Sequence, residues 1–149
     1  MKNKKGFTLI ELLLVISIIA VLAVTVFVAL DPAKRLADSR NSRRWSDANE
    51  ILTAIHSSIV DNGGVIPTGI GTTEKQLGTA ATGCNSPCTG AVAACLDMST
   101  TLAKYLKTIP VDPQGVAATT GYSVTMDTNK IITVKACSAE SGAVITVSR

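Results

Sequence analysis

The stretch that decides the fold lies at the amino end and reads KKGFTLIELLLVISIIAVLAVTVFVAL, from Lys4 to Leu30. Its part from Phe7 to Leu30 holds 24 residues, which as a helix extend about 36 Å against roughly 30 Å of bilayer hydrocarbon. Glu11 is the only charged residue in that part. An ionised side chain at mid-bilayer costs about 2.5 to 3.5 kcal/mol, so such residues usually mark function. The sequence therefore predicts a membrane-spanning helix whose single charge needs a partner.

The residues Gly6-Phe7-Thr8-Leu9-Ile10-Glu11 resemble the processing and assembly motif of the type IV filament family. This family comprises the type IV pilins and the pseudopilins of type II secretion. The resemblance implies that a prepilin peptidase cuts between Gly6 and Phe7 and methylates the new amino terminus at Phe7. Residues 1–6 would then be a short basic leader. An ordinary secretory signal has a shorter apolar region followed by a small-residue cleavage site, which this arrangement lacks.

Glu11 has two compatible interpretations. The spacing of Thr8 and Glu11 fits a capping box, and a carboxylate in the first turn suits the helix dipole. The resemblance implies a second role, in filament assembly. After cleavage the α-amino group of Phe7 is mostly cationic at neutral pH and lies one turn from Glu11. Pairing between neighbouring subunits would neutralise a carboxylate otherwise left in apolar surroundings.

The charge balance gives no support for an acidic ligand. The chain has 14 basic and 11 acidic residues, a net charge of +3, and three of the lysines belong to the leader (Lys2, Lys4 and Lys5). Those lysines favour a cytoplasmic amino end. Basic residues also follow the span, however, so the orientation rests mainly on the processing motif; they are Lys34, Arg35, Arg40, Arg43 and Arg44.

This basic cluster after the span has two interpretations, a solvated or headgroup-facing belt and a nucleic-acid contact. Acidic residues are interleaved with it, and Trp45 is the only aromatic residue nearby. Single-strand binding usually recruits several stacking rings, so we favour the belt and disfavour nucleic acid as a partner.

The segment 31–61 continues the helix in amphipathic form. Asp31-Pro32 predicts either a helix restart, with Asp31 as N-cap, or a kink. Beyond it an apolar stripe at spacings of three and four predicts the core-facing side, formed by Trp45, Ala48, Leu52, Ile55 and Ile59. Glycines 63 and 64 end the helix. His56, the only histidine, has no catalytic companion and is interpreted as structural.

Residues 62–149 predict one small globular head. It consists of a long loop at 62–98, a short helix at about 99–107, and antiparallel strands within 121–148, at 122–127, 131–136 and 144–147. The predicted fold class is α+β. We expect a long amino-terminal helix, half apolar anchor (7–30) and half amphipathic (31–61), to pack on a small carboxy-terminal antiparallel sheet. This order of elements resembles the type IV pilin fold.

Four cysteines support an oxidising exterior for the head. They allow three pairings, which the sequence leaves open. We favour Cys84–Cys88, which closes a short loop, together with Cys95–Cys137, which closes a 41-residue loop worth about 4 kcal/mol in the chain-entropy model. The spacing disfavours a structural zinc site.

The segment Ile109–Gly115 is similar to a turn of major pseudopilins, in which the loop that follows binds calcium. Asp112 is the matching residue, and it is a weak calcium candidate because the following loop offers no acidic side chain before Asp127. We therefore expect no metal, no cofactor and no catalytic residue, and the chain is not expected to be an enzyme.

The favoured function is that of a type IV pilin, polymerised through its amino-terminal helix into an extracellular filament for adhesion, motility or DNA uptake. The alternatives are a major pseudopilin of type II secretion and a minor tip pilin that binds DNA or a surface. The implied partners are further copies of the chain, prepilin peptidase, and the assembly platform and motor. The precursor would sit in the inner membrane, with its leader in the cytoplasm and its head outside, before joining an extracellular pilus.

Overall fold

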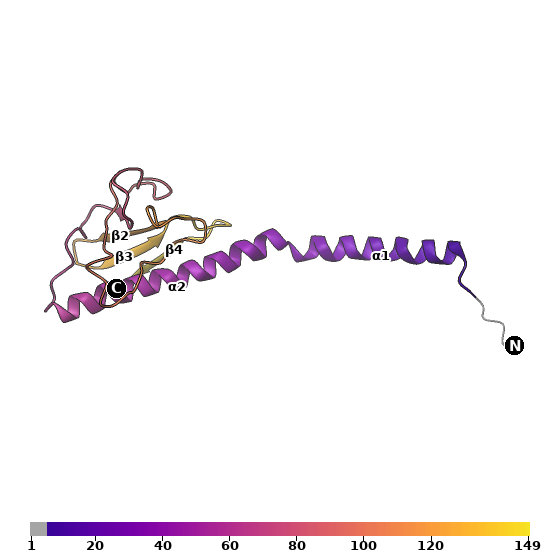
Figure 1. Ribbon diagram of the computed structural model, residues 1–149, viewed down its shortest axis with the longest axis horizontal. Helices are drawn as coiled ribbons and strands as arrows, with labels where there is room; N and C mark the ends of the chain where they lie inside the picture. Colours follow the sequence, from indigo (N-terminus) through magenta and orange to yellow (C-terminus); the bar gives the residue numbers. More distant parts are fainter. Residues whose placement is uncertain (1–5) are drawn as a thin grey trace. The chain divides into compact units, whose positions relative to one another are not determined.

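The computed structural model describes residues 6–149, so most of the predicted leader, including Lys2, Lys4 and Lys5, lies outside the described residues. The chain divides into two compact units, one ending at Leu36 and the other running from Ala37 to Arg149. Figure 1 shows the helices and strands of both units along the chain.

The first unit is built on helix α1, Leu9–Leu30. Thr8 caps its amino end, and Asp31 ends it with φ 38° and ψ 72°, in the left-handed region. Helix α2, Pro32–Asp61, begins at the next residue. The Oδ1 atom of Asp31 accepts a hydrogen bond from the Lys34 N–H at 3.3 Å, as an N-cap does. The predicted restart at Asp31-Pro32 is therefore confirmed.

The second unit contains the predicted globular head together with most of α2, and from here on we call this whole unit, residues 37–149, the head. It includes a four-stranded sheet. The strands are β1 Lys75–Gln76, β2 Tyr122–Met126, β3 Ile132–Ala136 and β4 Ile145–Ser148. They lie in the order β1-β2-β3-β4, and every neighbouring pair is antiparallel. The predicted α+β class, with a helix packed on a small antiparallel sheet, is confirmed.

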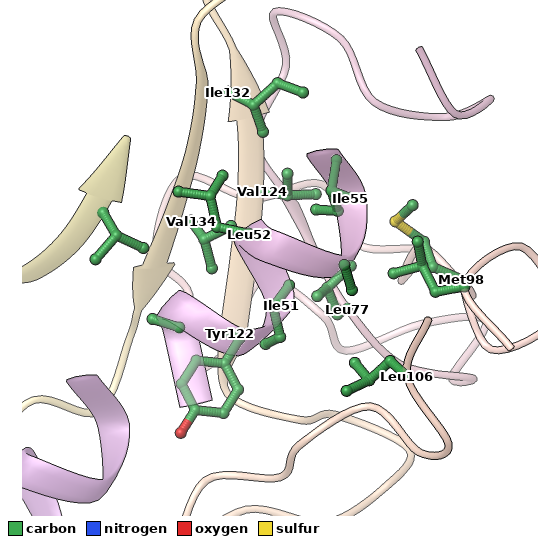
Figure 2. Close-up of a cluster of buried hydrophobic side chains, with 14 of the residues drawn as sticks. Ile51, Leu52, Ile55, Leu77, Met98, Leu106, Tyr122, Val124, Ile132 and Val134 are labelled. Carbon is green, nitrogen blue, oxygen red and sulfur yellow. The ribbon is translucent and has the colours of Figure 1, made fainter. Parts of the chain in front are cut away.

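The core lies between α2 and one face of the sheet (Figure 2). In β3 and β4 alternate residues are buried, so Val134 and Ile145 face the helix while their neighbours do not. Ile51 and Ile55 of α2 meet them, both fully buried. Further core side chains come from the loops, among them Leu77, Met98 and Leu106.

Two elements differ from the prediction. Residues 99–107 form turns rather than a helix, because their hydrogen bonds alternate in span: Leu106 N–H bonds to Leu102 O, whereas Tyr105 N–H also bonds to Leu102 O. The short strand β1 lies inside the segment predicted as a long loop. Its two residues are too few for a periodic signal.

The disulfides join Cys84 to Cys95 and Cys88 to Cys137. The predicted pairing, Cys84–Cys88 and Cys95–Cys137, is therefore wrong. The chain doubles back on itself between residues 80 and 95: the Cys84 N–H bonds to Ala93 O at 2.9 Å and the Cys95 N–H bonds to Ala80 O at 3.0 Å. This arrangement brings the Cα atoms of Cys84 and Cys95 to 5.2 Å. Cys88 is then left to fasten the loop to Cys137, just after β3.

Candidate functional site

The predicted cleavage site lies in a non-helical, exposed segment ahead of α1. Gly6 and Phe7 have no regular secondary structure, and Phe7 is 90% exposed. A Cβ atom added at Gly6 would meet no atom within 4 Å. Among residues 6–149, no group covers the segment that holds the peptide bond between Gly6 and Phe7.

Thr8 and Glu11 form the capping box that the sequence predicts. The Thr8 N–H and hydroxyl each donate to Glu11 Oε2 at 2.8 Å, and the Glu11 N–H donates back to the Thr8 hydroxyl at 3.3 Å. Both bonds to the carboxylate use one oxygen atom. Oε1 of Glu11 has no hydrogen-bond partner among residues 6–149. The carboxylate is therefore held in place by the cap of its own helix, and within the described residues Oε1 is left to accept a further hydrogen bond.

The remaining polar side chains of α1 are satisfied within the helix. The Ser17 hydroxyl donates to Leu14 O at 2.7 Å, and the Thr25 hydroxyl donates to Leu22 O at 2.8 Å. The apolar side chains of α1 are all exposed. By length and composition it is the one stretch of residues 6–149 able to cross a membrane as a helix. With 22 residues it measures about 33 Å.

A comparison with known protein families matches residues 1–27 to the prokaryotic N-terminal methylation motif. The chain carries the prepilin motif of type IV pilins and pseudopilins. Comparisons with curated proteins and with solved structures gave no match.

The prepilin motif is characteristic of structural filament subunits rather than of an enzyme family. It supports a type IV pilin or pseudopilin precursor that is processed by prepilin peptidase and polymerises into filaments. Together with the apolar helix it fits a membrane-anchored precursor. Gly6, Phe7, Thr8 and Glu11 all lie within the matched residues.

Outside the prepilin motif, the head contains a buried ion pair that the sequence did not reveal. Arg44 of α2 is fully buried, and its guanidinium donates to both carboxylate oxygens of Asp112, at 2.5 and 3.0 Å. It also donates to Glu140 at 3.3 Å and to the Asn41 side chain at 2.9 Å. Hydrogen bonding to Asp112 raises the pKa of Arg44, so it stays charged. Arg44 therefore joins two loops of the head to the helix, one through Asp112 and the other through Glu140.

Glu140 has a second basic partner, Arg40, one turn before Arg44. Arg40 donates to both oxygens of Glu140, at 2.7 and 3.0 Å. The hydrogen bonds from Arg40, with a smaller contribution from Arg44, lower the pKa of Glu140. Asn41 joins the same loop from the helix, donating to Glu140 O at 3.0 Å and accepting from the Glu140 N–H at 3.0 Å.

These contacts bear on the weak calcium candidate and correct the prediction for the basic cluster. Asp112 is a poor calcium candidate, because both of its carboxylate oxygens already bind Arg44. No group of three His, Cys, Asp or Glu side chains suited to a metal occurs within the described part of the chain. The basic cluster is also not a solvated belt throughout, because Arg44 is buried and Arg40 is paired.

The core-facing stripe of α2 differs from the predicted one at its amino-terminal end. Ala48, Leu52 and Ile55 are buried as predicted, but Trp45 is 43% exposed and Arg44 takes the inward position. His56 is partly buried, and its Nε2 atom is buried without a hydrogen-bond partner among residues 6–149. Arg44, and not Trp45, takes the inward position because its guanidinium binds the carboxylate of Asp112, which is 68 residues away in the sequence.

Proposed function

We propose that this chain is the structural subunit of a type IV pilus. Prepilin peptidase cuts it between Gly6 and Phe7, methylates Phe7, and leaves a subunit that polymerises through α1. The observation that carries the proposal is the prepilin motif, whose match over residues 1–27 includes most of the apolar helix α1 and its single carboxylate, Glu11. The exposure of the Gly6–Phe7 bond supports the cleavage step.

The free oxygen of Glu11 supports an intersubunit role for this residue. The capping box occupies Oε2 and holds the carboxylate at the start of α1, which leaves Oε1 to accept from the α-amino group of Phe7 of another copy. Such a charge-assisted bond is stronger in apolar surroundings than in water. When a subunit docks, the charge of its Phe7 α-amino group pairs with Glu11, which removes the free-energy cost of an unpaired carboxylate in apolar surroundings. Glu11 would therefore favour subunits with a free Phe7 amino group and also strengthen the contact between helices.

The implied partners follow from this role. They are many copies of the chain, the peptidase, and an assembly platform with its motor at the inner membrane. The precursor resides in that membrane, with its leader in the cytoplasm and its head outside, and the product is extracellular. The two disulfides of the head support an oxidising location outside the cytoplasm.

Intact mass spectrometry of sheared surface fibres tests this function. We expect a dominant species that lacks residues 1–6, carries one additional methyl group, and gains about four hydrogens when its two disulfides are reduced. An uncut chain would overturn the processing assignment. Fibres without this chain, with a processed form left in the membrane, would overturn its role as the main subunit.

Two substitutions at Gly6 isolate the cleavage step. The space around Gly6 is open, so a larger side chain does not strain this chain, and any effect reports on the peptidase. We expect Gly6→Ala to be cut more completely than Gly6→Leu, which should accumulate as precursor. Normal processing of Gly6→Leu, measured by immunoblot of membranes, would contradict the assignment of the scissile bond.

A major pseudopilin of type II secretion is the second candidate. It is favoured by the turn around Pro110 and Pro113, which resembles that of major pseudopilins, although Asp112 in this turn binds Arg44. Deleting the gene separates the candidates: loss of long surface filaments supports the pilus, and loss of protein secretion with filaments intact supports the pseudopilin. A minor tip subunit would instead show low copy number and salt-dependent DNA binding.

A further inference from the structure

The head contains a cavity of about 200 Å³ that none of the roles described above uses. We call it the head cavity. Its lining comes from loops, within residues 78–79, 97–99, 107–111 and 117–120. Among the lining residues Gly78 and Thr120 are buried, and Ile109 and Val111 are half-buried. The surface of the cavity is mainly apolar.

Main-chain hydrogen bonds hold the walls of the head cavity together. The Asp112 N–H donates to Thr120 O at 2.8 Å, and the Gly78 N–H donates to Leu96 O at 3.2 Å. A Cβ atom added at Gly78 would lie 2.2 Å from Ala118 O, so only glycine lets these two loops approach so closely. The head cavity is thus formed before any ligand arrives, as most ligand sites are.

Two charged side chains line the head cavity, Asp97 and Lys107, and both are exposed. They form no ion pair with each other or with any other group among residues 6–149. The Ser99 N–H donates to Asp97 Oδ1 at 2.9 Å, and hydrogen bonds from Ser99 lower the pKa of Asp97. Asp97 is therefore ionised at neutral pH. The cavity thus offers one anion and one cation, and no further Asp, Glu, Lys, Arg or His is among its lining residues.

This pair of charges selects among classes of ligand. A simple anion would meet Asp97 as a like charge, and a simple cation would meet Lys107 in the same way. A wholly apolar molecule would take water from both charged groups and pair with neither. A molecule that carries both an ammonium and a carboxylate satisfies both groups.

The volume of the head cavity limits the size of such a molecule. At about 30 Å³ for each water molecule, a cavity of about 200 Å³ holds roughly seven water-sized groups. A small aliphatic amino acid has this size. Its apolar side chain also matches the half-buried apolar lining at Ile109 and Val111.

We propose that the head cavity binds a free aliphatic α-amino acid of about the size of valine. Its α-ammonium pairs with Asp97 and its α-carboxylate with Lys107, while its side chain packs against Ile109 and Val111. Charge-assisted hydrogen bonds orient the ligand, and burial of the apolar side chain adds affinity. This proposal goes beyond filament formation and does not depend on it, because all of these residues belong to the head.

The first test leaves the protein unchanged and uses the full-length chain in a non-ionic detergent. Valine is compared with three molecules that each lack one of its groups: isovalerate lacks the ammonium, isobutylamine lacks the carboxylate, and glycine lacks the apolar side chain. Equilibrium dialysis with radiolabelled valine measures binding and competition, with protein-free micelles as the blank. We expect saturable valine binding with a Kd of about 1 mM or lower, and about tenfold weaker binding of each other molecule. No saturable binding of valine, or equal binding by any of the three, would overturn the proposal.

The second test separates the two charges by substitution. Asp97→Asn still accepts the Ser99 hydrogen bond but loses its charge. It should bind valine about tenfold more weakly and no longer prefer valine over isovalerate. Lys107→Met should weaken valine binding to a similar extent and no longer prefer valine over isobutylamine. Lys34→Met, at an exposed lysine of α2 outside the cavity, is the matched control and should bind as the unchanged protein does.

The preferences distinguish charge pairing from a general effect on the loops. If valine binding falls in both variants while both preferences persist, the assigned pairing is wrong. Near-ultraviolet circular dichroism checks that each variant is folded. If a variant does not fold, the four small molecules on the unchanged protein still decide the question.

Discussion

Helix α1 and the head differ in whether their apolar side chains are buried within the chain's own structure. In α1 the polar side chains are hydrogen-bonded within the helix and its cap, yet every apolar side chain is exposed, including Phe27 at 67%. In the head the apolar side chains are buried between α2 and the sheet, with Ile51 and Val134 at 0% exposure. The head can be stabilised by its own contacts, whereas α1 must obtain burial from a membrane or from other copies. Changes in one unit should therefore leave the other unaffected.

The largest effect on the head is expected from Arg44→Met. This change leaves Asp112 buried without its partner, and breaking a fully buried ion pair from one side costs about 3 to 5 kcal/mol. Chemical denaturation followed by near-ultraviolet circular dichroism measures the loss, and membrane insertion of α1 should not change. Arg43→Met, on the exposed side of the helix, is the matched control and should cost little. Equal stability of the Arg44 and Arg43 variants would show that the pair does not hold the head.

Removing a disulfide should have the next largest effect, and the loss of stability should grow with the length of the loop that the disulfide closes. Removing Cys88–Cys137, with a separation of 49 residues, should cost about 4 kcal/mol in the chain-entropy model. Removing Cys84–Cys95, with a separation of 11, should cost about 3 kcal/mol. Paired serine substitutions and urea denaturation measure both. Peptide mapping of the unreduced protein checks the pairing, and a Cys84–Cys88 peptide would contradict it.

Substitutions of Glu11 test whether α1 depends on contacts with other copies of the chain while the head does not. Glu11→Val should still be cut but should lower filament yield by roughly ten- to a hundredfold, as expected for a lost charge-assisted bond of about 1.5 to 3 kcal/mol. Glu11→Gln is the informative control, because glutamine preserves the capping box and removes only the charge. If Glu11→Gln assembles as well as the unchanged protein, capping explains the residue and intersubunit pairing does not. Head stability should be the same in all three.

The smallest expected effect is a pH dependence confined to the head. Arg40 holds the pKa of Glu140 below its ordinary value in the folded state. Ionised Glu140 therefore stabilises the head at pH values above the pKa that it has in the unfolded chain. This contribution is lost as the pH falls through the pKa of Glu140 in the folded state. Denaturation midpoints should therefore decline at acidic pH, in the range below about 4.5. Glu140→Gln should flatten this part of the profile. If the denaturation midpoints of Glu140→Gln decline with pH as steeply as those of the unchanged protein, other carboxylates cause the acid sensitivity.

The sequence was a good guide wherever the signal is local. The apolar span, the capping box of Thr8 and Glu11, and the restart at Asp31-Pro32 each depend on residues within one or two turns. The three longer strands also came within one or two residues of their observed bounds. In β3 and β4 alternate burial leaves a pattern of period two in the sequence.

The errors involve partners far apart in the chain. Arg44 looked like a surface residue because its partners, Asp112 and Glu140, are 68 and 96 residues away. The disulfide pairing was wrong because it depends on how the chain doubles back near Cys84, which short loop spacing does not reveal. In both cases tertiary structure places a residue against its local preference.

The buried pair of Arg44 and Asp112 also restricts how the head can change over evolutionary time. Losing either residue alone leaves a charge stranded in the interior, and Glu140 contacts the same guanidinium. Substitutions at these three positions should therefore be inherited together, with neutral or apolar residues replacing the whole set at once. Among related sequences, correlated replacement of these positions would identify heads that share this arrangement of loops, even where the rest of the head has diverged.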